Sequence, residues 1–144
     1  MKTQQTGYAL VFSLLLGLAL GCDGNAVATY PVSGRVVFSD GTPVSFGSVE
    51  FHNAEHDLTS SGSIEKDGSF RLGTFEDGDG APAGTHEAVV VQLIMNGQAG
   101  VTPHEHGRHI DSRFADYGAA DLTFEVSADG ENEFEIVVEP QSRR

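Results

Sequence analysis

Short apolar runs with a two-residue period, separated by turn residues, constrain the fold of this chain most. From Tyr30 onward, apolar and polar residues alternate in brief runs until Gly, Asp, Asn or Pro intervenes. Side chains at i and i+2 share one face of a strand, whereas a helix needs apolar residues at i, i+3 and i+4. No stretch of about 11 residues or more beyond Tyr30 keeps the helical spacing. The pattern predicts an all-β fold in which two sheets face each other, a β-sandwich of about seven strands.

The expected inward positions and turns follow from this alternation. The inward set is Val32, Gly34, Val36, Phe38, Val49, Phe51, Ile64, Phe70, Leu72, Leu122, Phe124, Val126, Phe134, Ile136 and Val138. Asp-Gly pairs at 40–41, 67–68 and 129–130 mark turns, because glycine tolerates positive φ. The second pair predicts a hairpin within 64–72, and the third predicts a closing hairpin between 122–126 and 134–138. Residues 96–120 are expected to form a loop.

The aromatic residues divide into two groups. The group on inward positions is expected in the core and comprises Phe38, Phe51, Phe70, Phe124 and Phe134. The group at strand ends or in loops is expected to be exposed and available for contacts, and comprises Phe46, Phe75, Phe114 and Tyr117. Burying roughly 15 large apolar side chains, at about 1.5–3 kcal/mol each, suits a small sandwich without a large internal pocket. Any site is therefore expected on loops.

Residues 1–22 have the features of an export signal. Lys2 precedes an apolar run from Tyr8 to Leu20 that only Ser13 interrupts. The run is about 13 residues long, too short to cross a hydrocarbon core of about 30 Å as a helix, but it suits the apolar region of a secretory signal. We therefore expect residues 1–21 to be a signal peptide.

The only cysteine, Cys22, directly follows Gly21. This pair resembles the lipobox of bacterial lipoproteins, in which the thiol is acylated and the cysteine becomes the new N-terminus. Ala19-Leu20 reverses the usual order of the preceding pair, so plain secretion or a retained anchor are the alternatives. One cysteine forms no intrachain disulfide, and a free thiol is unusual in an oxidising compartment unless a lipid occupies it. The sequence predicts a lipoprotein signal peptide at 1–21, a tether at 22–29 and one domain at 30–140.

The charge of the chain limits its partners. The 21 acidic and 8 basic residues give a net charge of −13, which becomes about −14 once Lys2 is removed with the signal peptide. Such a chain is repelled by nucleic acid and by anionic membrane surfaces. We expect attachment to the membrane through the N-terminal lipid only, no nucleic-acid binding, and an envelope protein or a glycan as partner. The expected location is the cell envelope, facing the periplasm or the exterior.

Four motifs in sequence order resemble a carboxypeptidase regulatory-like domain, which is also called transthyretin-like or prealbumin-like. They are Ser33-Gly34-Arg35-Val36, Asp40-Gly41-Thr42-Pro43-Val44, Gly47-Ser48-Val49-Glu50-Phe51 and Asp67-Gly68-Ser69-Phe70-Arg71-Leu72. A fifth, Gly80-Ala81-Pro82-Ala83-Gly84-Thr85-His86, resembles the step into the next strand of that family, except that His86 stands where tyrosine is usual. The likeness covers about 30–139 and includes small bacterial lipoproteins that carry this domain.

The resemblance implies a seven- to eight-stranded Greek-key β-sandwich with an accessory, structural or binding role. One branch of the transthyretin-like fold hydrolyses 5-hydroxyisourate and ends in a Y-R-G-S motif, which residues 139–144 lack. No nucleophile, base and orienting group are placed by a recognisable motif. We therefore expect a non-catalytic protein without a cofactor, although a fold alone does not determine function.

One cluster offers a different function. His104, His106 and His109 lie within six residues of an expected loop, together with Glu105. Imidazoles supported by a carboxylate are ligands that zinc and copper(II) prefer, so a periplasmic transition-metal-binding protein is the alternative hypothesis. The competing interpretation is a solvated loop whose histidines bind nothing specific. The spacing is not that of the helical H-E-x-x-H zinc motif.

A second loop is rich in carboxylates. Glu76, Asp77 and Asp79 place three carboxylates within five residues, and calcium accepts such oxygen ligands. The spacing departs from the EF-hand loop because no bidentate glutamate follows at the required offset. A solvated surface turn is the competing interpretation of this loop.

Overall fold

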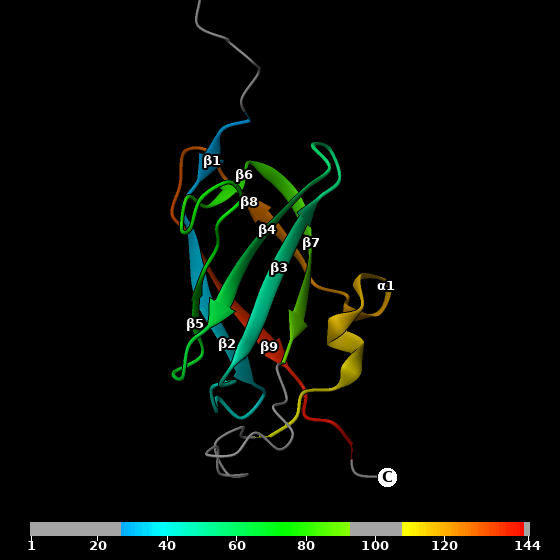
Figure 1. The fold of residues 1–144 in the computed structure, drawn as a ribbon. Helices are drawn as coiled ribbons and strands as arrows, with labels where there is room; N and C mark the ends of the chain where they lie inside the picture. The colour runs from blue at the N-terminus through cyan, green and yellow to red at the C-terminus, as the bar shows by residue number, and fades with distance from the viewer. Residues whose placement is uncertain (1–26, 93–107, 143–144) are drawn as a thin grey trace, which may run out of the picture.

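The computed structural model describes residues 27–92 and 108–142, and arranges them as a β-sandwich (Figure 1). The strands are β1 (Thr29–Tyr30), β2 (Val32–Phe38), β3 (Gly47–Asn53), β4 (Leu58–Ile64), β5 (Ser69–Arg71), β6 (Ala81–Pro82), β7 (Gly84–Val91), β8 (Thr123–Val126) and β9 (Asn132–Val138). A 3-10 helix η1 (Ser112–Ala115) and a short helix α1 (Tyr117–Ala120) lie between β7 and β8. The predicted all-β sandwich is confirmed.

Two main sheets form the layers. One has the strand order β5-β2-β9 and the other β4-β3-β7-β8, while β1 and β6 form a small separate pair. Strands β2 and β9 run parallel, in register from Val32 opposite Asn132 to Phe38 opposite Val138, and all other strand pairs are antiparallel. Strand β1 lies at one end of the sandwich, and β9 ends at the opposite end (Figure 1).

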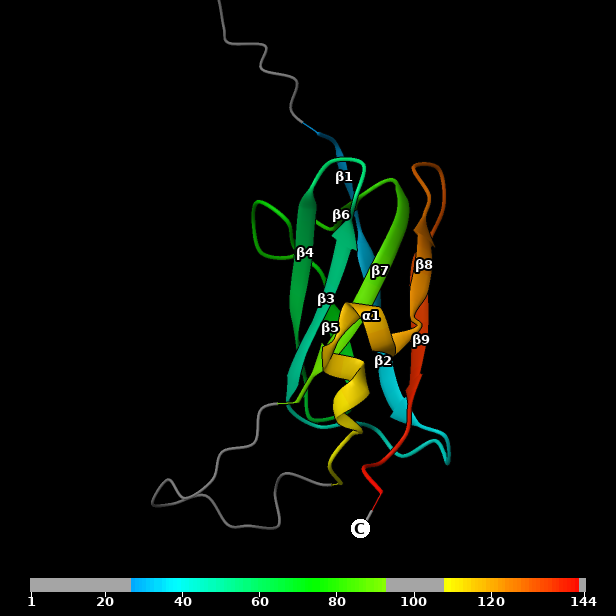
Figure 2. The ribbon, with the colours of Figure 1, turned by 90° about the vertical axis from the view of Figure 1, so that its right-hand side faces the viewer.

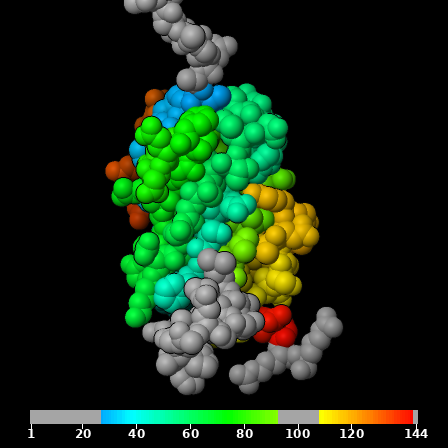
Figure 3. All heavy atoms as spheres, in the orientation of Figure 1, coloured from blue at the N-terminus to red at the C-terminus, as the bar shows by residue number. Residues whose placement is uncertain are grey.

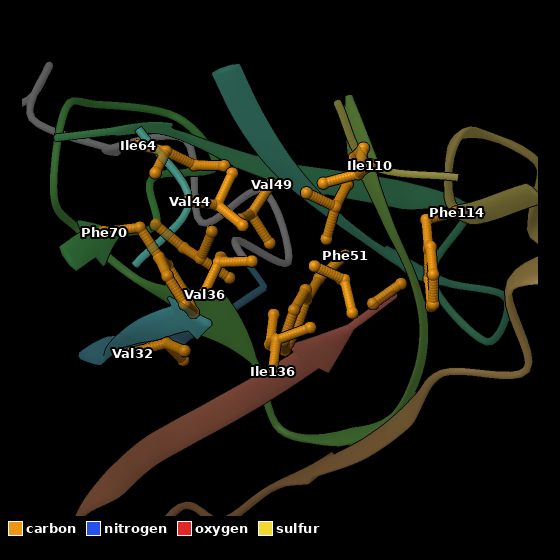
Figure 4. Close-up of a cluster of buried hydrophobic side chains, with 14 of the residues drawn as sticks. Val32, Val36, Val44, Val49, Phe51, Ile64, Phe70, Ile110, Phe114 and Ile136 are labelled. Atoms are coloured by element: carbon orange, nitrogen blue, oxygen red, sulfur yellow. The ribbon is translucent and has the colours of Figure 1, made fainter. Parts of the chain in front are cut away.

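The core lies between the sheets, where the alternation predicts it. Phe51 is fully buried, and the rings of Phe70, Phe124 and Phe134 surround it at centroid distances of 6.5, 5.0 and 5.9 Å. Figure 4 shows Phe51 within this cluster, with Phe70 toward one end and Phe114 toward the other. Phe124 and Phe134 are only partly buried. The predicted aromatic core is thus confirmed, with these two rings at its margin.

Both predicted hairpins are wrong. The turn at 65–68 does close, since the Glu65 N–H donates to the Ser69 carbonyl oxygen at 2.8 Å, but β4 then pairs with β3 whereas β5 pairs with β2. Likewise β8 pairs with β7 and β9 pairs with β2. Both connections cross from one sheet to the other, so we call them the 65–68 arch and the 127–131 arch. A two-residue period shows which face of a strand is buried but not which strand lies beside it.

The predictions of a loop through 120 and of an exposed Phe114 are also wrong, because η1 and α1 form at 112–115 and 117–120 and fill a gap in one sheet. Strand β8 pairs only with the first half of β7, from Gly84 to Glu87. Helices η1 and α1 pack beside β7, as Figure 2 shows, and their atoms stand on the flank of the molecule in Figure 3. Phe114 enters the core with only 3% of its surface exposed.

The other aromatic residues expected at the surface behave differently. Phe46 and Phe75 are 41% and 58% exposed, as predicted. Tyr117 is only partly buried, with its ring packed edge-on against His52 at a centroid distance of 6.0 Å. Its hydroxyl oxygen is 3.5 Å from a carboxylate oxygen of Glu50. Burial and the charges of Glu50 and Glu87 raise the pKa of Tyr117.

Within the described residues, no helix is both long and apolar enough to cross a bilayer. The predicted signal peptide and Cys22 lie outside the described residues.

Candidate functional site

An open groove lies along the outer face of the three-stranded sheet, with a volume of about 680 Å³. Its floor consists of outward-facing side chains of the sheet, and its two walls are the 65–68 arch and the loop at 73–80. We call it the β2–β5 groove. The floor residues are Ser33, Arg35, Ser69, Arg71 and Glu133.

The strand register sets the pattern of charges on this floor. Ser33 of β2 lies opposite Arg71 of β5 on one side and opposite Glu133 of β9 on the other. Arg35, two residues further along β2, lies opposite Ser69. The two arginines are therefore diagonal neighbours on the same face, a relation that places Cα atoms about 7–8 Å apart. Two like charges at this spacing favour an anion between or above them.

Neither arginine of the groove forms a salt bridge within the described residues, which hold five basic side chains. Two of the five do form salt bridges: Arg108 with Asp40 at 2.8 Å, and Arg113 with Glu139 at 3.0 Å. Arg35 donates one hydrogen bond, from Nη2 to the backbone oxygen of Asp67 at 2.9 Å. Carboxylates lie near both arginines, with Glu135 of β9 opposite Arg35, but none forms a salt bridge with either guanidinium in the described part of this strongly negative chain.

The 65–68 arch forms the first wall and is held by its own side chains. Asp67 Oδ1 accepts hydrogen bonds from the backbone N–H of Ser69 at 3.0 Å and from its hydroxyl at 2.6 Å. These bonds, with a smaller contribution from the charge of Arg35, lower the pKa of Asp67. Asp67 therefore stays ionised, and its carboxylate orients the arch at the edge of the groove.

The second wall is a loop that the carboxylate of Asp79 closes. Asp79 Oδ1 accepts from the N–H of Thr74 at 2.6 Å, and Oδ2 accepts from the N–H groups of Phe75 at 3.1 Å and Glu76 at 3.2 Å. These backbone bonds lower the pKa of Asp79. The loop is thereby fixed and carries Asp77 to the edge of the groove.

Gly78 allows this loop to lie close to the groove floor. Its φ is +76°, a conformation that other residues rarely adopt, and a Cβ there would lie 3.1 Å from Cδ of Arg71. The aliphatic part of the Arg71 side chain thus packs over a residue without a side chain. This contact leaves the guanidinium in the groove.

The predicted calcium ligands share this loop but do not gather around one cation. The carboxylate oxygens of Asp79 face backbone N–H groups, as described above. In residues 27–92 and 108–142, no group of three or more His, Cys, Asp or Glu side chains is placed to hold a metal ion. Of the three, Asp77 lines the groove, and the calcium site stays a prediction.

The predicted histidine cluster is described only in part. His104 and His106 lie outside the described residues. His109 is exposed, and its carbonyl oxygen accepts a hydrogen bond from the N–H of Gln141 at 2.8 Å. The transition-metal site stays a prediction.

The sequence reasoning missed Arg35 and Arg71 as site residues. Both stand at outward positions of alternating runs, flanked by inward Val36 and Phe70, so their exposure could have been inferred. Their proximity could not, because it follows from the pairing of β2 with β5 rather than of β4 with β5.

Comparisons with known proteins do not assign this chain to a family. No protein-family model, no curated protein and no solved structure matches the chain. The resemblance to carboxypeptidase regulatory-like domains therefore depends on the sequence motifs alone.

Proposed function

We propose that this chain is a cell-envelope lipoprotein in which acylated Cys22 tethers a non-catalytic binding module. The module would be a transthyretin-like Greek-key sandwich, as the order of the sequence motifs implies. The short apolar leader and the single cysteine after Gly21 support the lipid anchor. More than one acyl chain gives stable attachment, whereas a single chain binds only marginally.

The observation that carries the binding role is the β2–β5 groove. Its guanidinium, hydroxyl and carboxylate groups offer hydrogen bonds and ion pairs, which is the chemistry of reversible recognition. The groove lies on a rigid sheet, and hydrogen-bonded walls border it. A site held in this way binds a ligand without first having to become ordered.

The tether would keep this module close to the membrane. Residues 22–29 reach roughly 25 Å when fully extended, at about 3.3–3.6 Å per residue. Strand β1 follows the tether and lies at one end of the sandwich (Figure 1), whereas the residues of the groove lie on the β5-β2-β9 sheet and its neighbouring loops. The groove is thus open to ligands in the space next to the membrane.

The lipid anchor can be tested on the full-length chain, expressed in a bacterium that processes lipoproteins. We expect the membrane fraction to contain a chain that begins at Cys22, with an intact mass that includes acyl chains, and that partitions into detergent. Cys22→Ser should lose both the acyl mass and the detergent partitioning, while the neighbouring control Asn25→Ser should keep them. A wild-type chain recovered from the aqueous phase without acyl mass would refute the proposed anchor.

A further inference from the structure

We infer that the β2–β5 groove binds a glycan through a sugar unit that bears a single carboxylate. This inference rests on the proposed binding role and names the chemistry of the ligand. It follows from three properties of the groove: its guanidinium groups without salt bridges, the carboxylates around them and its serine hydroxyls.

The guanidinium groups favour an anionic group on the ligand. The Arg71 side chain has neither a salt bridge nor a hydrogen-bond partner within the described residues, and the Arg35 guanidinium uses only one of its five N–H donors. A planar guanidinium fork matches a carboxylate with two parallel hydrogen bonds, better than it matches a neutral hydroxyl. Because Gly78 supports the Arg71 side chain, this guanidinium is available to a ligand.

The surrounding carboxylates exclude a highly charged anion. Four acidic side chains line the groove beside the two arginines, namely Glu65, Asp67, Asp77 and Glu133. The groove is therefore negative overall, as is the whole chain, and a phosphorylated or polyanionic ligand would be repelled. Ionised carboxylates only accept hydrogen bonds, so the ligand must bring several donors around its single negative charge.

The hydroxyl groups favour a sugar over a peptide. Ser33, Ser63 and Ser69 line the groove, and a hydroxyl both donates and accepts, as sugar hydroxyls do. A peptide would also need apolar pockets for its side chains, but the only large apolar side chain among the lining residues is Phe70, which is 4% exposed. A volume of about 680 Å³ lies within the usual size of ligand sites, about 300–1,000 Å³.

The test uses the full-length acylated chain in detergent micelles and saturation-transfer NMR, which observes the ligand. The probe is D-glucuronic acid, compared with D-glucose, glucose 1-phosphate and the zwitterionic dipeptide glycylglycine. We expect glucuronic acid to bind with a dissociation constant of about 1 mM, which corresponds to about −4 kcal/mol. Glucose and glucose 1-phosphate should bind at least about tenfold more weakly.

Variants locate the binding site. Arg71→Ala should weaken glucuronic acid binding at least about tenfold, and Arg71→Lys should be intermediate, because it keeps the charge but loses the planar fork. The matched control Arg113→Ala removes an arginine that is paired with Glu139 away from the groove, and should leave binding unchanged. Amide NMR spectra of each variant check that the fold is intact.

Several outcomes would overturn the inference. Equal affinities for glucose and glucuronic acid would show that the carboxylate of the ligand is not recognised. An equal loss of glucuronic acid affinity in Arg71→Ala and Arg113→Ala would show that the groove is not the binding site. Preferential binding of glycylglycine would show that the groove recognises a peptide and not a glycan. Each of these results leaves the acylation of Cys22 untouched, so failure of the inference is distinguishable from failure of the proposed anchor.

Discussion

The two flanks of the sandwich are closed by different means. On one flank, which we call the backbone-closed flank, Ser61 of β4 and Gly73 after β5 exchange two backbone hydrogen bonds of 2.9 Å across the sheets. On the other, the plugged flank, β8 begins only opposite Glu87 of β7, and Phe114 of η1 fills the space beside the rest of β7. One flank depends on close backbone approach and the other on the volume of a side chain.

The two flanks should therefore tolerate different kinds of substitution. Backbone approach requires the absence of a side chain, and a Cβ at Gly62 would overlap the carbonyl oxygen of Arg71. On the plugged flank, a side chain must fill the space, and the aromatic ring of Phe114 does so. The backbone-closed flank should therefore be sensitive to added atoms, and the plugged flank to their removal.

The largest loss of stability should come from removing the Phe114 ring. Phe114→Ala removes a buried ring, and we expect it to lower the free energy of unfolding by about 3–4 kcal/mol, because the removed contacts leave a cavity. Urea denaturation measures this change. The exposed control Phe75→Ala should change stability by less than about 0.5 kcal/mol. Equal effects of the two substitutions would show that Phe114 does not close this flank.

A smaller effect should come from adding one carbon atom to the opposite flank. Gly62→Ala forces its new Cβ against the Arg71 carbonyl, and we expect a loss of about 2 kcal/mol in the free energy of unfolding. Gly130→Ala is the matched control, since a Cβ there would come no closer than 3.4 Å to a neighbouring atom. If Gly62→Ala were as stable as this control, the two flanks would not differ as described.

The 127–131 arch on the plugged flank depends on one buried amide. Asn132 donates to the carbonyl oxygens of Pro31 at 3.2 Å and Ser127 at 3.0 Å, and it accepts from the Ser127 N–H at 2.8 Å. Asn132→Ala should cost about 1–2 kcal/mol in the free energy of unfolding, because these backbone groups lose their partner. Thermal unfolding would check this against the exposed neighbour Glu131→Gln. A melting temperature equal to that of the control would contradict it.

The smallest effect concerns Arg108, which lies just before η1 in the chain. Arg108 pairs with Asp40 and lies 4.2 Å over the ring of Phe38. The hydrogen bond from Arg108, followed by those from Thr42, lowers the pKa of Asp40 from 3.8 to about 2. Because the folded-state pKa is the lower one, this stabilisation is present above about pH 4 and is lost as the pH falls toward about 2.

The measurement is the urea midpoint of the wild type and of Asp40→Asn as a function of pH. The difference between the two should be constant above about pH 4 and should shrink between about pH 4 and pH 2. A difference that does not change over this range would show that the ionised Asp40 carboxylate does not stabilise the fold through its pair with Arg108. The pair is exposed, so high salt should also reduce the difference.

The alternating runs predicted the layers and most of the core, because the burial of Val36, Phe51 and Ile136 depends only on which face of a strand is apolar. They failed where two distant segments meet. Phe114 is buried because β8 is short, and a four-residue η1 is too short to show a helical period. The groove could not be foreseen for the same reason, since Arg35 and Arg71 become neighbours only through the pairing of β2 with β5.

The parallel pairing of β2 and β9 has a mechanical consequence. Seven residue pairs join these strands in register, and β1 precedes the start of β2 while the described chain continues beyond the end of β9. A pulling force applied between the N-terminal and C-terminal ends of the domain would act along the two strands in opposite directions. The whole ladder would then resist in shear at once instead of unzipping bond by bond. Single-molecule stretching from the two termini would reveal this as a high rupture force.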